Sequence, residues 1–360
     1  MRKIKTSRGF KKIGVIIFLA AILTTGCSIQ LGTAKKVSTA GIFKSFDKGN
    51  TWTQKNLFLF SGGVGNIAGL NVVNLTFDPQ DNRAIYLASD AQGLFYTYDA
   101  GDSWMKAVPV GSARIESVAV DPKDKCTIYA TYGSTILKSN DCSRSWLEVY
   151  IDTRAAKAAV TALAIDNYNN LSIYAGNSAG DILKSQDGGA NWQVINRLND
   201  KVAKILVNPK DTRIVYVATK SKGIFKTTDS GGSWSDINEG LKPYSSSMEY
   251  KNLVFDLSQP NALLLVSKYG LIKTNDGGTS WEAIKLITPP ASTDIYSAAI
   301  NSQNNLEIYY STATTFYKTV DGGKNWITKR LPSGAVSTFL AVDLQNPNII
   351  YMGMTNFTKK

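Results

Sequence analysis

The sequence predicts an all-β protein, a seven-bladed β-propeller with four antiparallel strands in each blade. Three observations predict this fold. A short box with the pattern Ser/Thr-x-Asp-x-Gly-x-x-Trp recurs seven times, strand-like segments precede every box after the first, and the two ends of the chain supply complementary parts of one repeat.

The seven boxes contain every tryptophan of the chain, and their aspartates lie 42 to 52 residues apart, about the length of one blade. We expect the aspartate and the preceding Ser/Thr to hydrogen-bond to the backbone of a tight turn, and the tryptophan to bury its ring. A ring of metal-binding or catalytic carboxylates is disfavoured, because such residues need not recur in every repeat. The structural box residues are Asp47, Asp99, Asp141, Asp187, Asp229, Asp276 and Asp321, with Trp52, Trp104, Trp146, Trp192, Trp234, Trp281 and Trp326.

Each repeat is expected to contain strands A to D, with the box in the turn between C and D. Segments such as 73–89 and 203–219 have two β-branched, apolar runs separated by a turn that starts near Asp-Pro or Asn-Pro, which is typical of strands A and B. The chain starts with only a C–D pair and ends with only an A–B pair, over 337–354. We therefore expect the ends to form one composite blade, which closes the ring and removes exposed strand edges.

The first 26 residues have the features of an export signal. Six basic residues and no acid accompany an apolar run over 13–23, and their removal lowers the formal charge from +12 to +6. The run LTTGC at 23–27 resembles the bacterial lipobox, which implies lipidation of Cys27. We expect a signal peptide at 1–26, a tether at 27–37 and the propeller at 38–357, in a membrane-anchored lipoprotein that faces the periplasm, lumen or cell exterior. The alternative is an uncleaved N-terminal anchor.

With Cys27 assigned to lipidation, Cys126 and Cys142 remain, and an even number of cysteines in an exported protein favours a disulfide. The box that contains Cys142 reads KSNDCSRSW, with Ser143 where the other boxes have glycine. Cys126 is expected at the start of strand B and Cys142 in the C–D turn of the same blade. We predict that they form a disulfide, which would offset the strain of a positive φ at Ser143.

The boxes, from Ser45–Trp52 to Thr319–Trp326, resemble the Asp-box (BNR) repeat of sialidases, xyloglucanase-type glycosidases, sortilin-type VPS10 domains and photosystem II assembly or stability factors. The seven repeats and the length of a single propeller are most similar to the last group. The resemblance covers 38–357 and implies a propeller. It also implies that the boxes lie on the face opposite the binding site.

The chain contains no histidine, which excludes Ser-His-Asp triads, Cys–His pairs and histidine-ligated zinc or iron. No phosphate loop or dinucleotide fingerprint is present, so we expect no cofactor and no metal, and the glycine-rich stretch at 62–66 is interpreted as a loop between blades. A glycosidase needs only two carboxylates, for which Glu116 and Glu249, at or near the start of A strands, are the candidates. Export and the charge of +6 disfavour nucleic-acid binding.

The face opposite the boxes is predicted to carry basic and aromatic side chains, which are enriched in binding hot spots. The candidates are Arg114, Arg154, Arg197, Lys201, Lys242, Tyr244, Tyr250 and Arg330. Photosystem II assembly factors bind partners through a basic surface, and the resemblance implies the same here. The sequence therefore favours a monomeric, non-enzymatic binding or scaffold protein, which assembles or stabilises a membrane protein complex. The alternative is a carbohydrate-active hydrolase or lectin of sialidase or xyloglucanase type.

Overall fold

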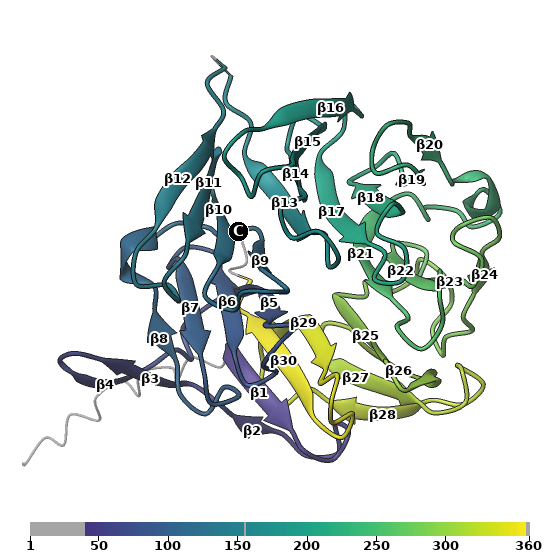
Figure 1. Ribbon diagram of the computed structural model, residues 1–360. Coiled ribbons are helices and arrows are strands. Elements are labelled where there is room, and N and C mark those ends of the chain that lie inside the picture. Colours follow the sequence, from purple (N-terminus) through teal and green to yellow (C-terminus); the bar gives the residue numbers. More distant parts are fainter. Residues whose placement is uncertain (1–39, 155, 358–360) are drawn as a thin grey trace, which may run out of the picture. The chain divides into compact units, whose positions relative to one another are not determined.

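The computed structural model describes residues 40–154 and 156–357, which form seven four-stranded antiparallel sheets arranged around a central channel (Figure 1). The prediction of a seven-bladed propeller is therefore confirmed. The signal peptide, the tether and Cys27 lie outside the described residues. Within the described part of the chain, no helix is both long enough and apolar enough to span a bilayer.

We number the blades 1 to 7 along the chain, and each sheet runs from an inner strand A to an outer strand D. Blades 1 to 3 consist of β5 (Val72–Phe77), β6 (Ile85–Ser89), β7 (Leu94–Thr97) and β8 (Met105–Lys106); β9 (Val118–Val120), β10 (Ile128–Tyr132), β11 (Thr135–Ser139) and β12 (Leu147–Ile151); and β13 (Val160–Ile165), β14 (Ile173–Asn177), β15 (Asp181–Ser185) and β16 (Gln193–Arg197). Blades 4 to 6 consist of β17 (Val202–Val207), β18 (Val215–Thr219), β19 (Ile224–Thr227) and β20 (Ser235–Asp236); β21 (Tyr250–Phe255), β22 (Leu263–Ser267), β23 (Leu271–Thr274) and β24 (Glu282–Ala283); and β25 (Ser297–Asn301), β26 (Asn304–Ser311), β27 (Thr315–Thr319) and β28 (Ile327–Arg330).

Blade 7 is the composite blade that the sequence predicts. It consists of β29 (Val336–Val342) and β30 (Ile350–Thr355) from the C-terminal end and β1 (Gly41–Ser45) and β2 (Thr53–Gln54) from the N-terminal end. Strand β1 pairs with β30 along its whole length, from Gly41 opposite Met354 to Ser45 opposite Ile350. In Figure 1 the purple β1 and the yellow β30 lie side by side. Every residue of these two strands is buried, so the closure of the ring is part of the core.

The glycine-rich stretch at 62–66 is not the plain loop that the sequence suggested. It belongs to an extra hairpin of β3 (Leu57–Phe60) and β4 (Gly63–Asn66), inserted between blades 7 and 1. Two backbone hydrogen bonds attach the hairpin to the edge of blade 1: Leu59 N donates to Trp104 O, and Trp104 N donates to Leu57 O, both at 2.8 Å. The hairpin exposes Phe60 (50%) and Val64 (71%).

The hydrophobic core is divided into clusters at the contacts between neighbouring blades. Tyr129 and Ile136 of blade 2, for example, pack with Leu163 and Ile173 of blade 3. Each blade therefore depends on its neighbours for burial of its apolar surface, as in other repeat architectures. Two short 3-10 helices, η1 (Val108–Val110) and η2 (Glu239–Leu241), follow the outer strands of blades 1 and 4.

Candidate binding face and central channel

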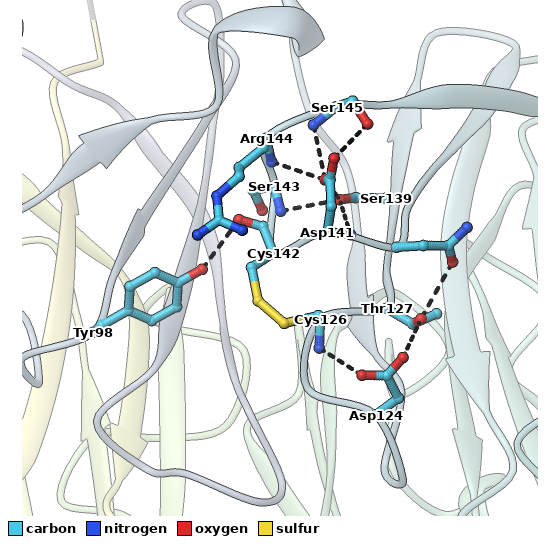
Figure 2. The surroundings of a disulfide bond; sticks show 11 residues. Tyr98, Asp124, Cys126, Thr127, Ser139, Asp141, Cys142, Ser143, Arg144 and Ser145 are labelled. Atoms are coloured by element: carbon cyan, nitrogen blue, oxygen red, sulfur yellow. Dashed lines mark hydrogen bonds between the residues drawn. A yellow bond between two sulfur atoms is a disulfide. The ribbon is translucent and has the colours of Figure 1, made fainter.

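The box residues form a tight turn between strands C and D of each blade. In blade 2, Asp141 accepts hydrogen bonds from the Arg144 backbone N (3.0 Å), the Ser145 N (2.8 Å) and the Ser145 Oγ (2.6 Å), as Figure 2 shows. These bonds, the Ser145 hydroxyl first, lower the pKa of Asp141 to about 2. Because the carboxylate is held by its own turn, it has the geometry of a structural group and not of a reactive one.

Each turn contains two successive residues with positive φ. They are Gly188 (69°) and Gly189 (91°) in blade 3, and Cys142 (58°) and Ser143 (70°) in blade 2. The first of the two is often not glycine, which the box pattern does not reveal. The second position requires glycine where a neighbouring side chain is close. In blade 5, for example, a Cβ on Gly278 would lie 2.2 Å from Ile237 Cδ1.

The box tryptophans are less uniform than the sequence suggested. Trp104 is fully buried, and its Nε1 donates to Lys55 O at 2.8 Å, while Trp281 is 7% exposed. The other five are only partly buried, at the outer edge of their blades. The contribution of a tryptophan to stability therefore differs from blade to blade.

The predicted disulfide between Cys126 and Cys142 is confirmed. The two Cα atoms lie 4.0 Å apart, well inside the limit of about 7 Å for a bridge. The backbone supports the same contact, because Cys142 N donates to Cys126 O at 3.1 Å. The bridge joins the A–B turn of blade 2 to its C–D turn.

A second contact of the boxes connects neighbouring blades, and the sequence pattern did not predict it. In blade 2, Lys138 Nζ and Tyr129 Oη donate to the carbonyl of Gly188 in the box of blade 3, at 2.9 and 2.8 Å. The ammonium also lies 5.3 Å from the centroid of the Tyr129 ring. The same pair of donors recurs as Lys184 and Tyr174 on Ser230 O, and as Lys44 and Tyr351 on Ala100 O. We call this contact the lysine–tyrosine clamp.

The candidate residues of the opposite face are mostly engaged in ion pairs. Five of the eight contact acids: Arg114 pairs with Asp90 and Glu116, Arg154 with Asp152 and Asp181, Arg197 with Asp181, Lys201 with Glu116, and Lys242 with Glu239. Tyr244 donates to Trp281 O at 3.0 Å, and Tyr250 is partly buried at the channel, where burial raises its pKa. Arg330 is exposed, with no acid in contact among the described residues. The face is thus a mixture of both charges.

The Arg154 group is the most connected of these ion pairs. Its guanidinium donates to both oxygens of Asp152, which is 2% exposed, and to Asp181 Oδ2 at 2.7 Å. The arginine, and then the backbone of its own loop, hold the pKa of Asp152 well below its usual range. Arg154 therefore stabilises the loop before β13, in addition to any contact that it makes with a ligand.

The inner strands enclose two cavities along the channel. One, of about 380 Å³, has mainly apolar walls that include Phe77, Leu206 and Phe255, near the ends of their strands on the box side. The other, of about 250 Å³, is more polar and is lined by residues from the starts of the inner strands, such as Glu116 and Tyr250. Lys204 of β17 lines both. Its signal in the sequence is a lysine within the apolar strand VAKILV.

The structure does not bring the two candidate glutamates together. Glu116 lines the smaller cavity and pairs with Arg114 Nε at 2.9 Å and Lys201 Nζ at 3.6 Å, whereas Glu249 is exposed and lines neither cavity. Among the described residues around the two cavities, Glu116 is the one carboxylate. Within 40–154 and 156–357, no group of three or more Cys, Asp or Glu residues has the arrangement of a metal site.

Comparisons with known proteins agree with this architecture. The family model described as "Photosynthesis system II assembly factor YCF48" matches residues 29–212, just over half of the chain, and a Sortilin-Vps10 model matches 180–273. A xyloglucanase of Hypocrea jecorina is 30% identical over 39% of this chain and 19% of its own length. The photosystem II assembly protein Ycf48 of Thermosynechococcus vestitus is 26% identical over 45% of this chain and 44% of its own. The chain thus spans less than half of the length of these relatives.

Solved structures of both kinds share the fold. A GH74 enzyme of Niastella koreensis superimposes with a TM-score of 0.65 at 15% identity, over 80% of this chain and 51% of that one. A structure described as YCF48 bound to D1 peptide superimposes with a TM-score of 0.61 at 17% identity, over 81% of this chain and 94% of that one. At these identities the likeness concerns the fold alone.

Proposed function

Since the chain belongs to the photosynthesis system II assembly factor YCF48 family, we propose that it is a non-enzymatic binding protein that assembles or stabilises a membrane protein complex. The family match is the observation that carries this proposal. The YCF48 structure with which this chain superimposes contains a bound D1 peptide, and the superposition covers 94% of the YCF48 chain. This supports a polypeptide as the ligand class.

The geometry supports the face opposite the boxes as the contact surface. The polar groups of the boxes form hydrogen bonds within their own turns and in the lysine–tyrosine clamps. These groups are therefore used to hold the propeller together and are not free to contact a partner. The opposite face has arginines at the ends of outer strands, such as Arg197, whose side chain is 69% exposed, and Arg330. The polar cavity opens at the starts of the inner strands. The acids and bases of this face suit a partner with charges of both signs, with acidic segments facing Arg330.

Affinity purification with two charge-reversed variants tests this proposal. The protein is used as bait on detergent-solubilised membranes of its host, and Arg197→Glu/Arg330→Glu is compared with Lys123→Glu/Lys125→Glu on the box side, where both lysines are exposed. We expect one membrane protein to co-purify with the wild type and the control and to be lost with the first variant. Absence of a specific partner, or equal loss with both variants, would contradict the proposal.

A carbohydrate-active function is the second candidate, and the 30% identity to a xyloglucanase favours it. Hydrolysis needs two carboxylates about 5 to 10 Å apart. Glu116 is the one carboxylate among the described residues that line the two cavities, and its neighbour Asp90, which contacts the same Arg114 guanidinium, lines neither. Purified protein incubated with xyloglucan and sialoside panels decides the matter. Turnover that disappears in Glu116→Gln or Glu249→Gln would replace the scaffold proposal with a hydrolase.

We also propose that Cys27 anchors the protein to a membrane outside the cytoplasm, as a lipoprotein. The disulfide supports an oxidising compartment, because such bonds persist there. Membrane fractionation of Cys27→Ala, with mass spectrometry of the mature N-terminus, tests the anchor. A membrane-bound Cys27→Ala protein with an intact N-terminus would instead indicate an uncleaved anchor.

A further inference from the structure

Lys204 is a cation without a partner inside the channel. Its Nζ forms no ion pair or hydrogen bond with residues 40–154 or 156–357, although it lines both cavities. Two other lysines of the smaller cavity are paired: Lys201 Nζ lies 3.6 Å from Glu116 Oε1, and Lys251 Nζ lies 3.6 Å from Asp294 Oδ1. Lys204 therefore differs from Lys201 and Lys251 because no described carboxylate pairs with its ammonium group.

The surroundings of Lys204 disfavour an isolated charge. Burial lowers the pKa of its ammonium below the ordinary value, and no nearby carboxylate raises it again. Removing a charged group from water is costly unless an opposite charge or hydrogen bonds compensate. The smaller, more polar cavity that Lys204 lines has a volume of about 250 Å³, enough for several water molecules or a small ligand group.

Amide groups lie at the same level of the channel as Lys204. In β17, Lys204 pairs with Ala218 just after a bulge, and Asn74 in β5 and Asn252 in β21 hold the equivalent positions, opposite Ala88 and Val266. Asn252 Oδ1 accepts from Leu253 N at 2.9 Å, so its amide nitrogen is left as a donor. Both asparagines line the same two cavities as Lys204.

We propose that the central channel binds an oxyanion, a carboxylate or phosphate group, through Lys204 Nζ with the amides of Asn74 and Asn252. The ammonium supplies the charge and the amides supply directed hydrogen bonds, a combination that favours anionic oxygens. The oxyanion has two sources: a small diffusible anion, or an acidic side chain of a polypeptide bound at the face. The site goes beyond the proposed function, because a diffusible anion would bind whether or not the face has a protein partner.

Isothermal titration of the full chain at constant ionic strength tests the site. The probes are inorganic phosphate, glutarate, and an N-acetylated, C-amidated peptide of glutamates. We expect saturable binding of at least one probe, weakened about tenfold or more in Lys204→Met, because a hydrogen bond to a charged group is lost. Lys251→Met is the matched control: it removes the same charge from the same cavity, but that charge is already paired with Asp294, so we expect a change below about threefold.

The probes and the stability of the free protein separate the outcomes. Binding of phosphate or glutarate identifies a small anion, and binding of the peptide alone identifies an acidic side chain. Without anion, Lys204→Met should melt at a higher temperature than the wild type, because an uncompensated ammonium is replaced by an apolar chain; a lysine with a merely structural role predicts the reverse. Lys204→Gln repeats the comparison if the methionine variant does not fold. Failure of every probe to bind, or equal binding by wild type and Lys204 variants, would overturn the site.

Discussion

The box turns of blades 2 and 3 have the same sequence pattern but are anchored differently. In blade 3, the carbonyl of Gly188 accepts hydrogen bonds from Lys138 and Tyr129 of the preceding blade. In blade 2, the equivalent carbonyl belongs to Cys142 and accepts one bond, from Tyr98 Oη at 3.3 Å, while the disulfide holds the turn from within its own blade (Figure 2).

The difference originates in one position of the preceding blade. Lys138 lies opposite Tyr129 in the pairing of strands C and B, and the corresponding pair in blade 1 is Tyr96 opposite Tyr86. Blade 1 therefore has no lysine to donate to the box of blade 2. We infer that the disulfide replaces the missing lysine of the clamp. In blade 2 a covalent bond within the blade fixes the box turn, whereas in blade 3 hydrogen bonds from the preceding blade fix it.

Removal of the disulfide should have the largest effect. Cys126→Ser/Cys142→Ser is expected to lose about 3 kcal/mol of unfolding free energy, because a cross-link between residues 16 apart no longer restricts the unfolded chain. Urea denaturation with tryptophan fluorescence measures the loss. Wild-type protein under reducing conditions is the control and should move to the same midpoint; an unchanged midpoint in both would contradict a stabilising role.

Removal of one clamp should have a smaller effect. Lys138→Met deletes the ammonium that donates to Gly188 O and leaves a side chain of similar length. We expect a loss of about 1 kcal/mol, since the hydrogen bond is only partly shielded from water. Lys324→Met, an exposed lysine in the box of blade 6, is the control and should change the urea midpoint little. Equal effects of the two variants would mean that the clamp is dispensable.

The propeller and the disulfide could be predicted from the sequence, but the clamp could not. The repeat length, the box and the unpaired ends predicted the propeller and its composite blade, because each is a local pattern. The disulfide was predicted because both cysteines fall in one repeat. The lysine–tyrosine pair recurs in several blades, but the acceptor of Lys138 lies 50 residues further along the chain, which no local pattern shows.

The candidate site was harder to predict for the same reason. Arg114, Arg154 and Lys201 were recognised as basic residues of one face. Arg114 and Arg154 each have one acid two residues away, but Asp90, Asp181 and the Glu116 that pairs with Lys201 lie on other segments, so the full balance of charge became visible only in the fold. Lys204 resembles an exposed lysine of an ordinary strand. Only the arrangement of seven inner strands places it in a channel without an acid beside it.

A double-mutant cycle can test whether the disulfide and the clamp substitute for each other. Tyr96→Lys places a lysine opposite Tyr86, in register with the clamp lysines of other blades. Alone it should destabilise the protein, since the Tyr96 ring packs 5.3 Å from that of Tyr98. In the variant without cysteines the cost should be smaller by about 0.5 to 1 kcal/mol, because the new ammonium can reach the carbonyl of residue 142. Strictly additive effects would show that the disulfide and the clamp do not substitute for each other.

The smallest difference is expected in the response to acid. The pKa of Asp141 is lowered to about 2, chiefly by the Ser145 hydroxyl, and that of Asp187 to about 2, chiefly by the Asn191 amide. Because both folded-state values lie below the usual 3.8, each carboxylate stabilises the fold above about pH 4 and loses that contribution as the pH falls toward about 2. Urea midpoints measured across this range for Asp141→Asn and Asp187→Asn should show equally reduced pH dependence. A smaller reduction for Asp141→Asn would mean that the disulfide already holds the turn without its carboxylate.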